Sequence, residues 1–479
     1  MFLHVAQNEV GGLMDANSQI HTRNRCLLKS NVVSRHFLLP INDYIEGTDV
    51  SKQLTLLEKS QWWKSKDLQD YQNKRLRAII HHAYANVPYY HELFRSLDIY
   101  PSDISTKEDL VKLPVLTKED IRKNPERFIA QNTPQKSRIH ETTSGSSGKV
   151  FEYFIDRDTL SLSRAAGLRA WGFAGYGVGD RIVTLAGSSL LPKNTSLYNK
   201  VRFKFSSNLP LSSYGLNSER LSYYLRQMMK FNPRYIRGYP SSIALLAEHA
   251  LEQGIDSINL NGVMTTAETL SKRQRETISS AFDCDVYDQF GCFDGGANAC
   301  ECNQHSGYHI SVERSVHEFL DDSAFPVAPG ENGRIILTDL WNYAMPFIRY
   351  DAGDMGVPTD RTCTCGRGLP LLERITGRTV EQIILPDGSR LPGLLLTDIF
   401  EHGSIVIAIR DYQIVQEKVD KFVVNIVQSD QYSSSICEEI QEFFQGHLGS
   451  YVDVQFNILD KIPRTDANKR RIVICNVRG

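Results

Sequence analysis

Apolar residues recur at three- and four-residue steps between positions 61 and 97, and Pro88 interrupts this pattern. Such spacing places apolar side chains on one face of a helix, and a proline ends or breaks a helix. The segment therefore predicts two amphipathic helices separated by a break. Residues 1–50 show only weak periodicity and predict no element.

The pattern changes between residues 180 and 296, where short apolar runs alternate with helical periodicity. A strand is predicted after Asp180, a strand–turn–helix unit over residues 234–254, a second such unit over 261–282, and a further strand before the loop at 291–296. Ser241 or Ser242 is predicted to cap the first of these two helices. The alternation predicts a largely parallel sheet with flanking helices, and binding residues at the carboxyl ends of its strands.

A different pattern begins after Arg378. It predicts a hairpin around Asp387 and Gly388, two strands over residues 411–427, a helix over 434–448 and a strand over 452–459. Because 479 residues exceed the size of one core, at least two domains are expected. We predict an α/β protein with a large N-terminal domain (1–377) of mixed, largely parallel sheets and flanking helices, and a small C-terminal α+β domain (378–479).

Composition and charge narrow the possible partners. The chain is 41% hydrophobic and 23% charged, as globular proteins are, and its net charge of −2 gives no basis for binding nucleic acid. No apolar run reaches the length of a membrane span, and the first residues lack the features of a secretory signal. Nine cysteines, an odd number in a long chain, favour reduced thiols and a cytoplasmic location.

The stretch TTSGSSGKV at residues 142–150 combines small hydroxyl residues, glycines and one lysine. Glycines let the backbone approach a ligand closely, and amide and hydroxyl donors beside a lysine suit phosphate oxygens. The P-loop pattern does not fit, because Thr143 and Val150 stand where it requires Gly and Ser or Thr. From this stretch alone, a flexible surface linker is the alternative.

Six further stretches, taken in order with this loop, resemble one family. They are GYPSS at 238–242, TTAE at 265–268, FGCFD at 290–294, PFIRYDAGD at 346–354, ITGR at 375–378 and IPRTDANKRR at 462–471. They are similar to motifs of adenylate-forming enzymes of the phenylacetate–CoA ligase group, which includes capsular polysaccharide biosynthesis proteins. The resemblance extends from about residue 61 to the end of the chain and disfavours the linker.

The resemblance implies ATP-dependent activation of a carboxylic acid as an acyl-adenylate, followed by transfer to CoA. Lys469 is the implied catalytic residue, brought to the nucleotide by a mobile C-terminal domain, and Glu381 is the implied hinge carboxylate. Asp354 is expected to accept the ribose hydroxyls, and Glu268 to lie near the adenine or to cap a helix. ATP or AMP binding is implied for Thr143, Ser144, Gly145, Ser146, Ser147, Gly148, Lys149, Glu268, Gln289, Phe290, Gly291, Asp354 and Arg378, and an acid pocket for Tyr239, Pro240, Ser241 and Thr266.

Three positions depart from the family pattern. Asp294 replaces the usual Glu that helps to hold Mg²⁺, Phe290 lacks the hydroxyl of the usual Tyr, and Asn468 replaces the usual Gly. Aspartate is a competent oxygen ligand, one methylene shorter, so Mg²⁺ is still expected at Asp294. These departures keep open the alternative of a nucleotide-binding protein without catalysis.

Two C-x-C pairs suggest a zinc site. Cys302, His309, Cys363 and Cys365 match the ligand set expected in part of the family, with Cys300 as an alternative ligand. Three thiolates and one imidazole make a closed tetrahedral site of the structural kind. Two unrelated pairs of thiols are the alternative.

The acyl acceptor and the acid stay open. The acceptor is CoA or, alternatively, an amine, hydroxyl or carrier thiol, for example in surface polysaccharide assembly. The expected partners are a small carboxylic acid, ATP and CoA, and a homodimer is possible. Tyr239 and Phe290 are compatible with an aryl acid without identifying it.

Overall fold

The computed structural model describes residues 32–144, 150–187, 190–191, 207–378, 381–401, 403–465 and 468–477. The first helices are a π-helix at Ser34–Leu38, then α2 (Leu39–Glu46), α3 (Val50–Ser60), α4 (Ser65–Asn86) and α5 (Pro88–Ser96). The predicted break is confirmed, since α5 begins at Pro88, whose missing N–H suits the first helical position. Short 3₁₀ turns follow at Pro101–Asp103, Lys107–Lys112, Pro125–Phe128 and Gln135–Ser137, with α6 at Lys118–Lys123.

An 11-stranded sheet forms the centre of the molecule, in the order β10-β11-β12-β13-β9-β8-β7-β6-β5-β3-β4. One half, from β4 to β7, is parallel. Its strands are β3 (Ile182–Ala186), β4 (Asn208–Ser212), β5 (Tyr235–Gly238), β6 (Gly262–Thr266) and β7 (Val286–Cys292), and its helices are α7 (Arg157–Phe173), α9 (Ser218–Phe231), α10 (Pro240–Glu252) and α11 (Lys272–Phe282). The strand–helix alternation predicted from the sequence is confirmed here.

The other half of the sheet is antiparallel and was not predicted strand by strand. It comprises β8 (Ala297–Glu301), β9 (Tyr308–Ile310), β10 (Ser315–Leu320), β11 (Gly333–Asp339), β12 (Tyr350–Pro358) and β13 (Leu371–Arg378). A separate hairpin pairs β1 (Ile139–Ser144) with β2 (Val150–Ile155). The mixed α/β fold expected for the large domain is confirmed.

The residues from 381 onward, the C-terminal module, form a smaller α+β unit. The predicted hairpin is present as β14 (Gln382–Ile384) and β15 (Arg390–Pro392). A four-stranded sheet, β18-β17-β16-β19, packs with α13. The remaining elements are a 3₁₀ helix at Gly393–Glu401, α12 (Gly403–Ala408), β16 (Ile409–Lys418), β17 (Lys421–Gln428), α13 (Ser435–Leu448), β18 (Asp453–Ile458) and β19 (Val473–Cys475).

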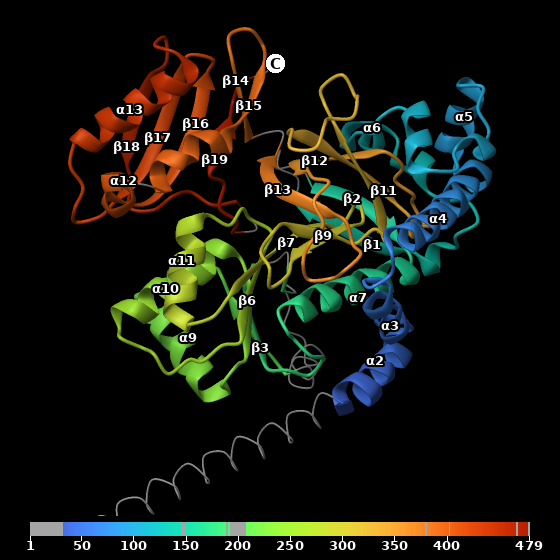
Figure 1. Cartoon of the computed structure of the whole chain (residues 1–479), viewed down its shortest axis with the longest axis horizontal. Helices are drawn as coiled ribbons and strands as arrows, with labels where there is room; N and C mark the ends of the chain where they lie inside the picture. Colours follow the sequence, from blue (N-terminus) through green and yellow to red (C-terminus); the bar gives the residue numbers. More distant parts are fainter. Residues whose placement is uncertain are drawn as a thin grey trace, which may run out of the picture.

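The C-terminal module lies against the carboxyl-end side of the parallel half, above α10 and α11 in Figure 1. Strand β13 is the last strand of the large sheet and ends at Arg378. The domain boundary between 377 and 378 stays a prediction, and we propose that the pivot lies in the short connection between Arg378 and the start of β14. Residues 32–378 are called the large module below.

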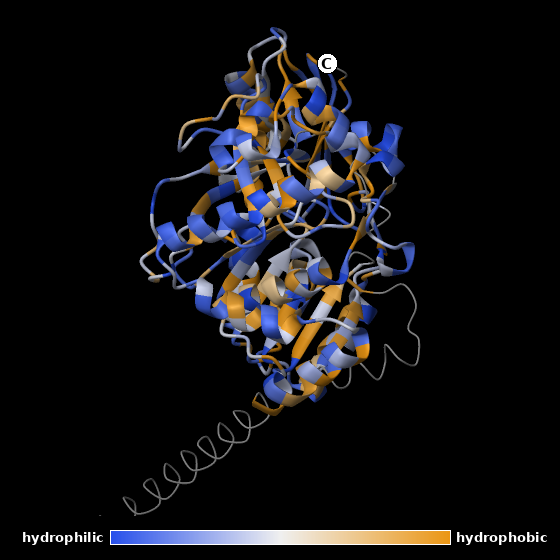
Figure 2. Ribbon diagram, turned by 90° about the vertical axis from the view of Figure 1, so that its right-hand side faces the viewer, coloured by the Kyte–Doolittle hydropathy of each residue, from blue (hydrophilic) through white to orange (hydrophobic). Residues whose placement is uncertain are grey.

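Apolar strands make up the interior, while polar side chains concentrate on the outer helices (Figure 2). Strands β3, β6 and β8 are buried along their whole length. Gly238, the last residue of β5, is required by close packing, because a Cβ there would collide with the carbonyl oxygen of Leu185. In the part of the chain that the structure describes, no helix combines the length and apolarity needed to cross a bilayer.

The prediction that Ser241 or Ser242 caps α10 is wrong. The N-cap residue is Tyr239, and Pro240 occupies the first helical position, where its fixed φ suits the helix. The backbone N–H of Ser241 is instead satisfied from a distant loop, by the carboxylate of Glu268 at 3.2 Å.

Candidate active site

Asp354 and Arg378 face each other across neighbouring strands β12 and β13. Arg378 Nε lies 3.4 Å from Asp354 Oδ1. Burial raises the pKa of Asp354, although Arg378 and Lys118 oppose this shift, while Asp354 raises the pKa of Arg378. The backbone N–H of Arg378 donates to Glu381 Oε2 at 3.1 Å. Two predicted nucleotide residues and the predicted hinge carboxylate are therefore adjacent.

Lys469 lies beside this pair although it belongs to the C-terminal module. Burial and the nearby Arg378 lower the pKa of Lys469 to about 8, while Glu268 and Asp354 act in the opposite direction. The turn that presents it is tight: Thr465 Oγ1 accepts from the N–H of Lys469, and Thr465 O from that of Asn468. A cation carried by the small module thus lies within electrostatic reach of Asp354 in the middle of β12 and Arg378 at the end of β13.

Glu268 joins the two modules. One carboxylate oxygen accepts from the N–H of Ser241 at the start of α10, and the other from the N–H of Arg470 at 2.6 Å. The carboxylate of Glu268 faces the positive end of the dipole of the preceding helix α10, whereas the capping role expected for it concerned the following helix α11, whose N-cap is Ser271. It also fixes the backbone next to Lys469.

Asn468 has φ +59°, in the left-handed region that glycine and asparagine tolerate best. Its side-chain amide donates to the carbonyl of Ser213 at 2.6 Å and to the Ser213 hydroxyl at 3.1 Å. The usual glycine would allow the same backbone but could not make these bonds. The substitution therefore adds a contact between the lysine turn and the large module.

Asp294 is buried and its carboxylate is already engaged. Oδ1 accepts from Cys292 Sγ at 3.0 Å, and Oδ2 accepts from Tyr350 Oη at 2.6 Å and lies 3.2 Å from Lys118 Nζ. Burial opposes ionisation, but Lys118 and these hydrogen bonds hold the pKa of Asp294 below its usual value. A divalent cation would compete with an ammonium group for the same oxygen, so this arrangement does not fit Mg²⁺ at Asp294.

Lys118 was not identified from the sequence. It begins α6, whose N-terminus is closed by a reciprocal bond pair between Thr117 and Asp120. The segment before it is fixed by Arg349, which has φ +56° and donates to the carbonyl of Leu113 at 2.6 Å. Backbone bonds at 2.8 Å also pair Leu116 with this part of the RYDAGD segment. The chain thus folds to hold a second lysine at the site.

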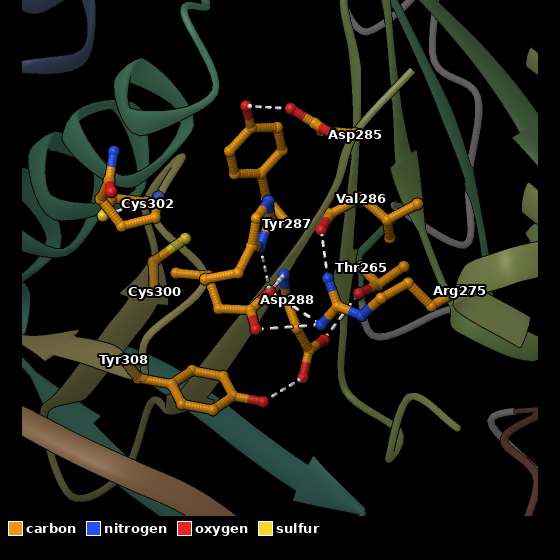
Figure 3. A network of polar contacts seen from close by, with 12 residues as sticks. Thr265, Arg275, Asp285, Val286, Tyr287, Asp288, Cys300, Cys302 and Tyr308 are labelled. Atoms are coloured by element: carbon orange, nitrogen blue, oxygen red, sulfur yellow. Dashed lines mark hydrogen bonds and ion pairs between the residues drawn. The ribbon is translucent and has the colours of Figure 1, made fainter. Parts of the chain in front are cut away.

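A buried network shown in Figure 3 fixes the ends of β6 and β7. Asp288 accepts from the hydroxyls of Thr265 at 2.6 Å and Tyr308 at 2.8 Å. Its own N–H donates to Glu301, which Arg275 holds with two bonds of 2.9 Å. Burial raises the pKa of Asp288 to about 6. Asp288 was also missed, although it directly precedes the predicted nucleotide residues Gln289, Phe290 and Gly291 on β7.

Several of the other predicted nucleotide and acid-pocket residues lie at the ends of strands or at the start of α10. Thr143 and Ser144 end β1, whereas Gly145, Ser146, Ser147, Gly148 and Lys149 fall outside the described residues. Tyr239, Pro240 and Ser241 form the buried start of α10, and Thr266 ends β6. The expected roles of all these residues stay predictions.

The four predicted zinc ligands meet in one cluster. The ligand atoms of Cys302, His309, Cys363 and Cys365 all lie within 4.8 Å of one another. Cys302 Sγ is 3.6 Å from Cys363 Sγ, and His309 Nε2 is 3.4 Å from the sulfurs of Cys302 and Cys365. Tetrahedral zinc with Zn–S bonds of about 2.3 Å requires sulfurs roughly 3.8 Å apart, so the set fits. Cys300, the alternative, points elsewhere and contacts the carbonyl of Ala170.

Sequence comparison finds relatives along most of the chain. Residues 383–476 match the protein-family model of the CapK C-terminal domain. The chain is 26% identical to Protein CapK of Staphylococcus aureus, over 86% of this chain and 90% of CapK. It is 27% identical to phenylacetate-coenzyme A ligase of Escherichia coli, over 85% of this chain and 94% of the ligase. The resemblance seen in the motifs is confirmed.

Solved structures of 2-hydroxyisobutyryl-CoA ligase share the fold at 19–20% identity. The postadenylation state with R3-HIB-AMP gives a TM-score of 0.71, with 88% of this chain and 92% of that chain covered. The open conformation gives 0.60, with 87% and 93% covered, and the thioesterification state 0.57, with 87% and 91% covered. The chain as a whole therefore superposes more closely on the postadenylation structure than on the other two.

Proposed function

Because the chain is a homologue of CapK and of phenylacetate–CoA ligases and has the fold of adenylate-forming ligases, we propose that it is an ATP-dependent acid–CoA ligase. It activates a carboxylic acid as an acyl-adenylate and transfers the acyl group to CoA. The observation that carries the proposal is the placement of Lys469: its turn in the C-terminal module bonds Ser213 and Glu268 of the large module, and the charges of Arg378 and Asp354 act on its pKa.

In the first step, a carboxylate oxygen of the acid forms a bond to the α-phosphorus of ATP, and the bond to pyrophosphate breaks. Both reactants are anionic, so the protein contributes chiefly by positioning them and by stabilising negative charge. We assign the ribose hydroxyls to Asp354 and the charge at the α-phosphate to Lys469 and Arg378. Lys118, held next to Asp294, adds a further positive charge on the same side.

In the second step, the thiolate of CoA attacks the acyl carbon and AMP leaves. Because Lys469 and its turn fill the approach to the adenylate in this arrangement, we propose that the C-terminal module rotates about the connection after Arg378. Glu381 lies at that connection and bonds the backbone of Arg378. Such domain motions between half-reactions occur on the microsecond to millisecond scale.

We propose that zinc, when bound by Cys302, His309, Cys363 and Cys365, is structural. The cluster joins the loop after β8 to the loop before β13, and it packs against α4 and α7 in a small apolar cluster. Four protein ligands leave no open position for chemistry. Magnesium stays a prediction without an assigned protein ligand, as do a cytoplasmic location and a homodimer.

The test is an ATP–pyrophosphate exchange assay with a panel of carboxylic acids, followed by detection of AMP and acyl-CoA when CoA is added. Exchange together with a CoA-dependent thioester supports the proposal. Exchange without any CoA product supports the alternative acceptor, an amine, hydroxyl or carrier thiol. If Lys469→Ala leaves exchange unchanged, the proposed mechanism is wrong. If the wild type shows no exchange with any acid of the panel, the protein binds a nucleotide without catalysis.

A further inference from the structure

Arg237 lies in the interior of the parallel half without a counter-ion. It is the third residue of β5, paired with Thr184 on β3 and Met264 on β6. Its Nε is buried without a hydrogen-bond partner, and among the described residues no carboxylate forms an ion pair with its guanidinium. Burial lowers the pKa of Arg237 to about 10, and only Tyr176 and Tyr239 oppose that shift.

A second unsatisfied donor lies beside it. The guanidinium carbon of Arg237 is 4.5 Å from the centre of the Trp171 ring, and Trp171 Nε1 is also buried without a partner. Tyr176 packs edge-on against the same indole, with 5.4 Å between ring centres. Buried N–H groups are nearly always satisfied in proteins, and a buried charge is nearly always compensated. Two N–H groups without acceptors and a cation without a counter-ion among the described residues together indicate a binding site for an anion.

The position of Arg237 relates this cluster to the predicted acid pocket. Side chains two residues apart on a strand point to the same face of the sheet. Arg237, Met264 and Tyr287 form one row across β5, β6 and β7. The next row toward the strand ends consists of Tyr239, Thr266 and Gln289, the residues expected around the acid and the nucleotide.

The distance between these rows defines a ligand length. One row step along a strand is about 7 Å. The activated carboxylate must lie at the strand ends, near Lys469 and Asp354. An acid that extends from there along the face of the sheet places its far end at Arg237. Arg237 and Trp171 are both partly exposed, so solvent reaches part of this cluster.

We propose that Arg237, assisted by the indole N–H of Trp171, binds a second carboxylate of the substrate, so that the enzyme activates a dicarboxylic acid at one end. This inference rests on the proposed function and names its substrate class. A planar guanidinium stacked on an indole presents its N–H groups edge-on, the geometry that suits a carboxylate with two oxygens. A neutral aryl or alkyl acid would leave the charge uncompensated and both donors unsatisfied.

The test compares acids that differ only in their far end. Dicarboxylates from glutarate to suberate, and terephthalate, are each paired with the monocarboxylate of the same skeleton, such as adipate with hexanoate and terephthalate with 4-methylbenzoate. ATP–pyrophosphate exchange gives kcat/KM for each acid. The wild type is expected to favour at least one dicarboxylate over its partner by about 100-fold, since a site built to bond a polar group strongly rejects the analogue that lacks it.

Variants separate binding from folding. Arg237→Leu is expected to lower kcat/KM for the dicarboxylate about 100-fold while leaving the monocarboxylate within about threefold. Arg237→Lys keeps the charge but not the paired donors, so its kcat/KM for the dicarboxylate should lie between those of the wild type and Arg237→Leu. Trp171→Phe removes the indole N–H and keeps a smaller aromatic ring under the guanidinium, and a loss of about fivefold is expected. Arg226→Leu, which removes an exposed arginine of α9, serves as the control and should change neither value.

A binding measurement separates the two proposals. The dicarboxylate alone is expected to raise the Tm of the wild type and not that of Arg237→Leu. Efficient exchange with monocarboxylates and none with dicarboxylates overturns the inference but not the proposed function. The same conclusion follows if a folded Arg237→Leu variant loses exchange with dicarboxylates and monocarboxylates equally. A dicarboxylate-dependent rise in Tm without exchange upholds the binding site and contradicts the ligase function. The absence of both signals contradicts both proposals.

Discussion

The pH dependence of adenylation tests the assignment of Lys469 directly. Its ammonium group lies in a buried position beside Arg378, and both effects lower the pKa of Lys469 to about 8. Lysine stabilises phosphate charge only while it is protonated, so activity should fall as the pH rises through this value. With a pKa of about 8, roughly nine tenths of the free enzyme carries the charge at pH 7 and about one tenth at pH 9. The expected loss in kcat/KM between these two pH values is about tenfold.

The measurement is ATP–pyrophosphate exchange at subsaturating ATP from pH 6 to 9.5, because kcat/KM reports the pKa values of the free enzyme. Lys469→Arg, whose side chain keeps its charge throughout this range, provides the matched variant. Its absolute activity is expected to be lower, but its profile should be flat above pH 8. Transfer to CoA from isolated acyl-adenylate should not show the falling limb, since thiolate formation increases with pH. The assignment is refuted if kcat/KM of the wild type stays constant up to pH 9.5, or if kcat/KM of Lys469→Arg falls over the same pH range as that of the wild type.

Three further predictions address the surroundings of the site. Asn468→Gly removes two hydrogen bonds between the modules and should weaken their docking by about 1–2 kcal/mol. ATP–pyrophosphate exchange is then expected to slow about 5- to 30-fold, while transfer from isolated acyl-adenylate keeps its rate. Unchanged exchange would show that these bonds do not contribute to docking. Lys118→Met leaves the buried carboxylate of Asp294 without its cation and should lower the free energy of unfolding in urea by about 2–3 kcal/mol. Adding Asp294→Asn to this variant should restore part of the loss. An unchanged urea concentration at the unfolding midpoint would contradict the ion pair. Metal analysis should find about one zinc ion per chain, lost in Cys302→Ala and retained in Cys300→Ala, while less than about 0.2 zinc in the wild type argues against the site.

The parallel half of the fold could be predicted because its signals are local. Short apolar runs, turn residues and helical periodicity follow one another from β3 to β7, and Pro88 marks the start of α5. The antiparallel half lacks such signals. Strand β8 is buried throughout and shows no alternation, and the pairings of β11–β12 and β12–β13 contain register shifts. The cap of α10 was mispredicted because its partner, Glu268, comes from a distant loop.

The candidate site divides in the same way. Asp354, Arg378 and Lys469 were predicted because they stand within motifs, and the structure brings them together. Lys118 and Arg237 were not predicted, because Lys118 stands outside the motifs and Arg237 directly precedes the GYPSS stretch without belonging to it. Their significance depends on tertiary contacts: Lys118 meets the carboxylate of Asp294 in the turn after β7, and Arg237 meets an indole from α7 and no carboxylate of the described residues. Tertiary placement alone distinguishes such residues from ordinary surface cations.

The contacts between the modules have a consequence for turnover. Hydrogen bonds join the modules across the boundary: Arg273 donates to two backbone carbonyls, Arg464 to the hydroxyl of Ser241, and Asn468 and Arg470 to groups of the large module. Each such bond can be exchanged for one with water, at a net difference of about 1 kcal/mol. A joint held by such bonds can open and reclose in every catalytic cycle at a small cost in free energy.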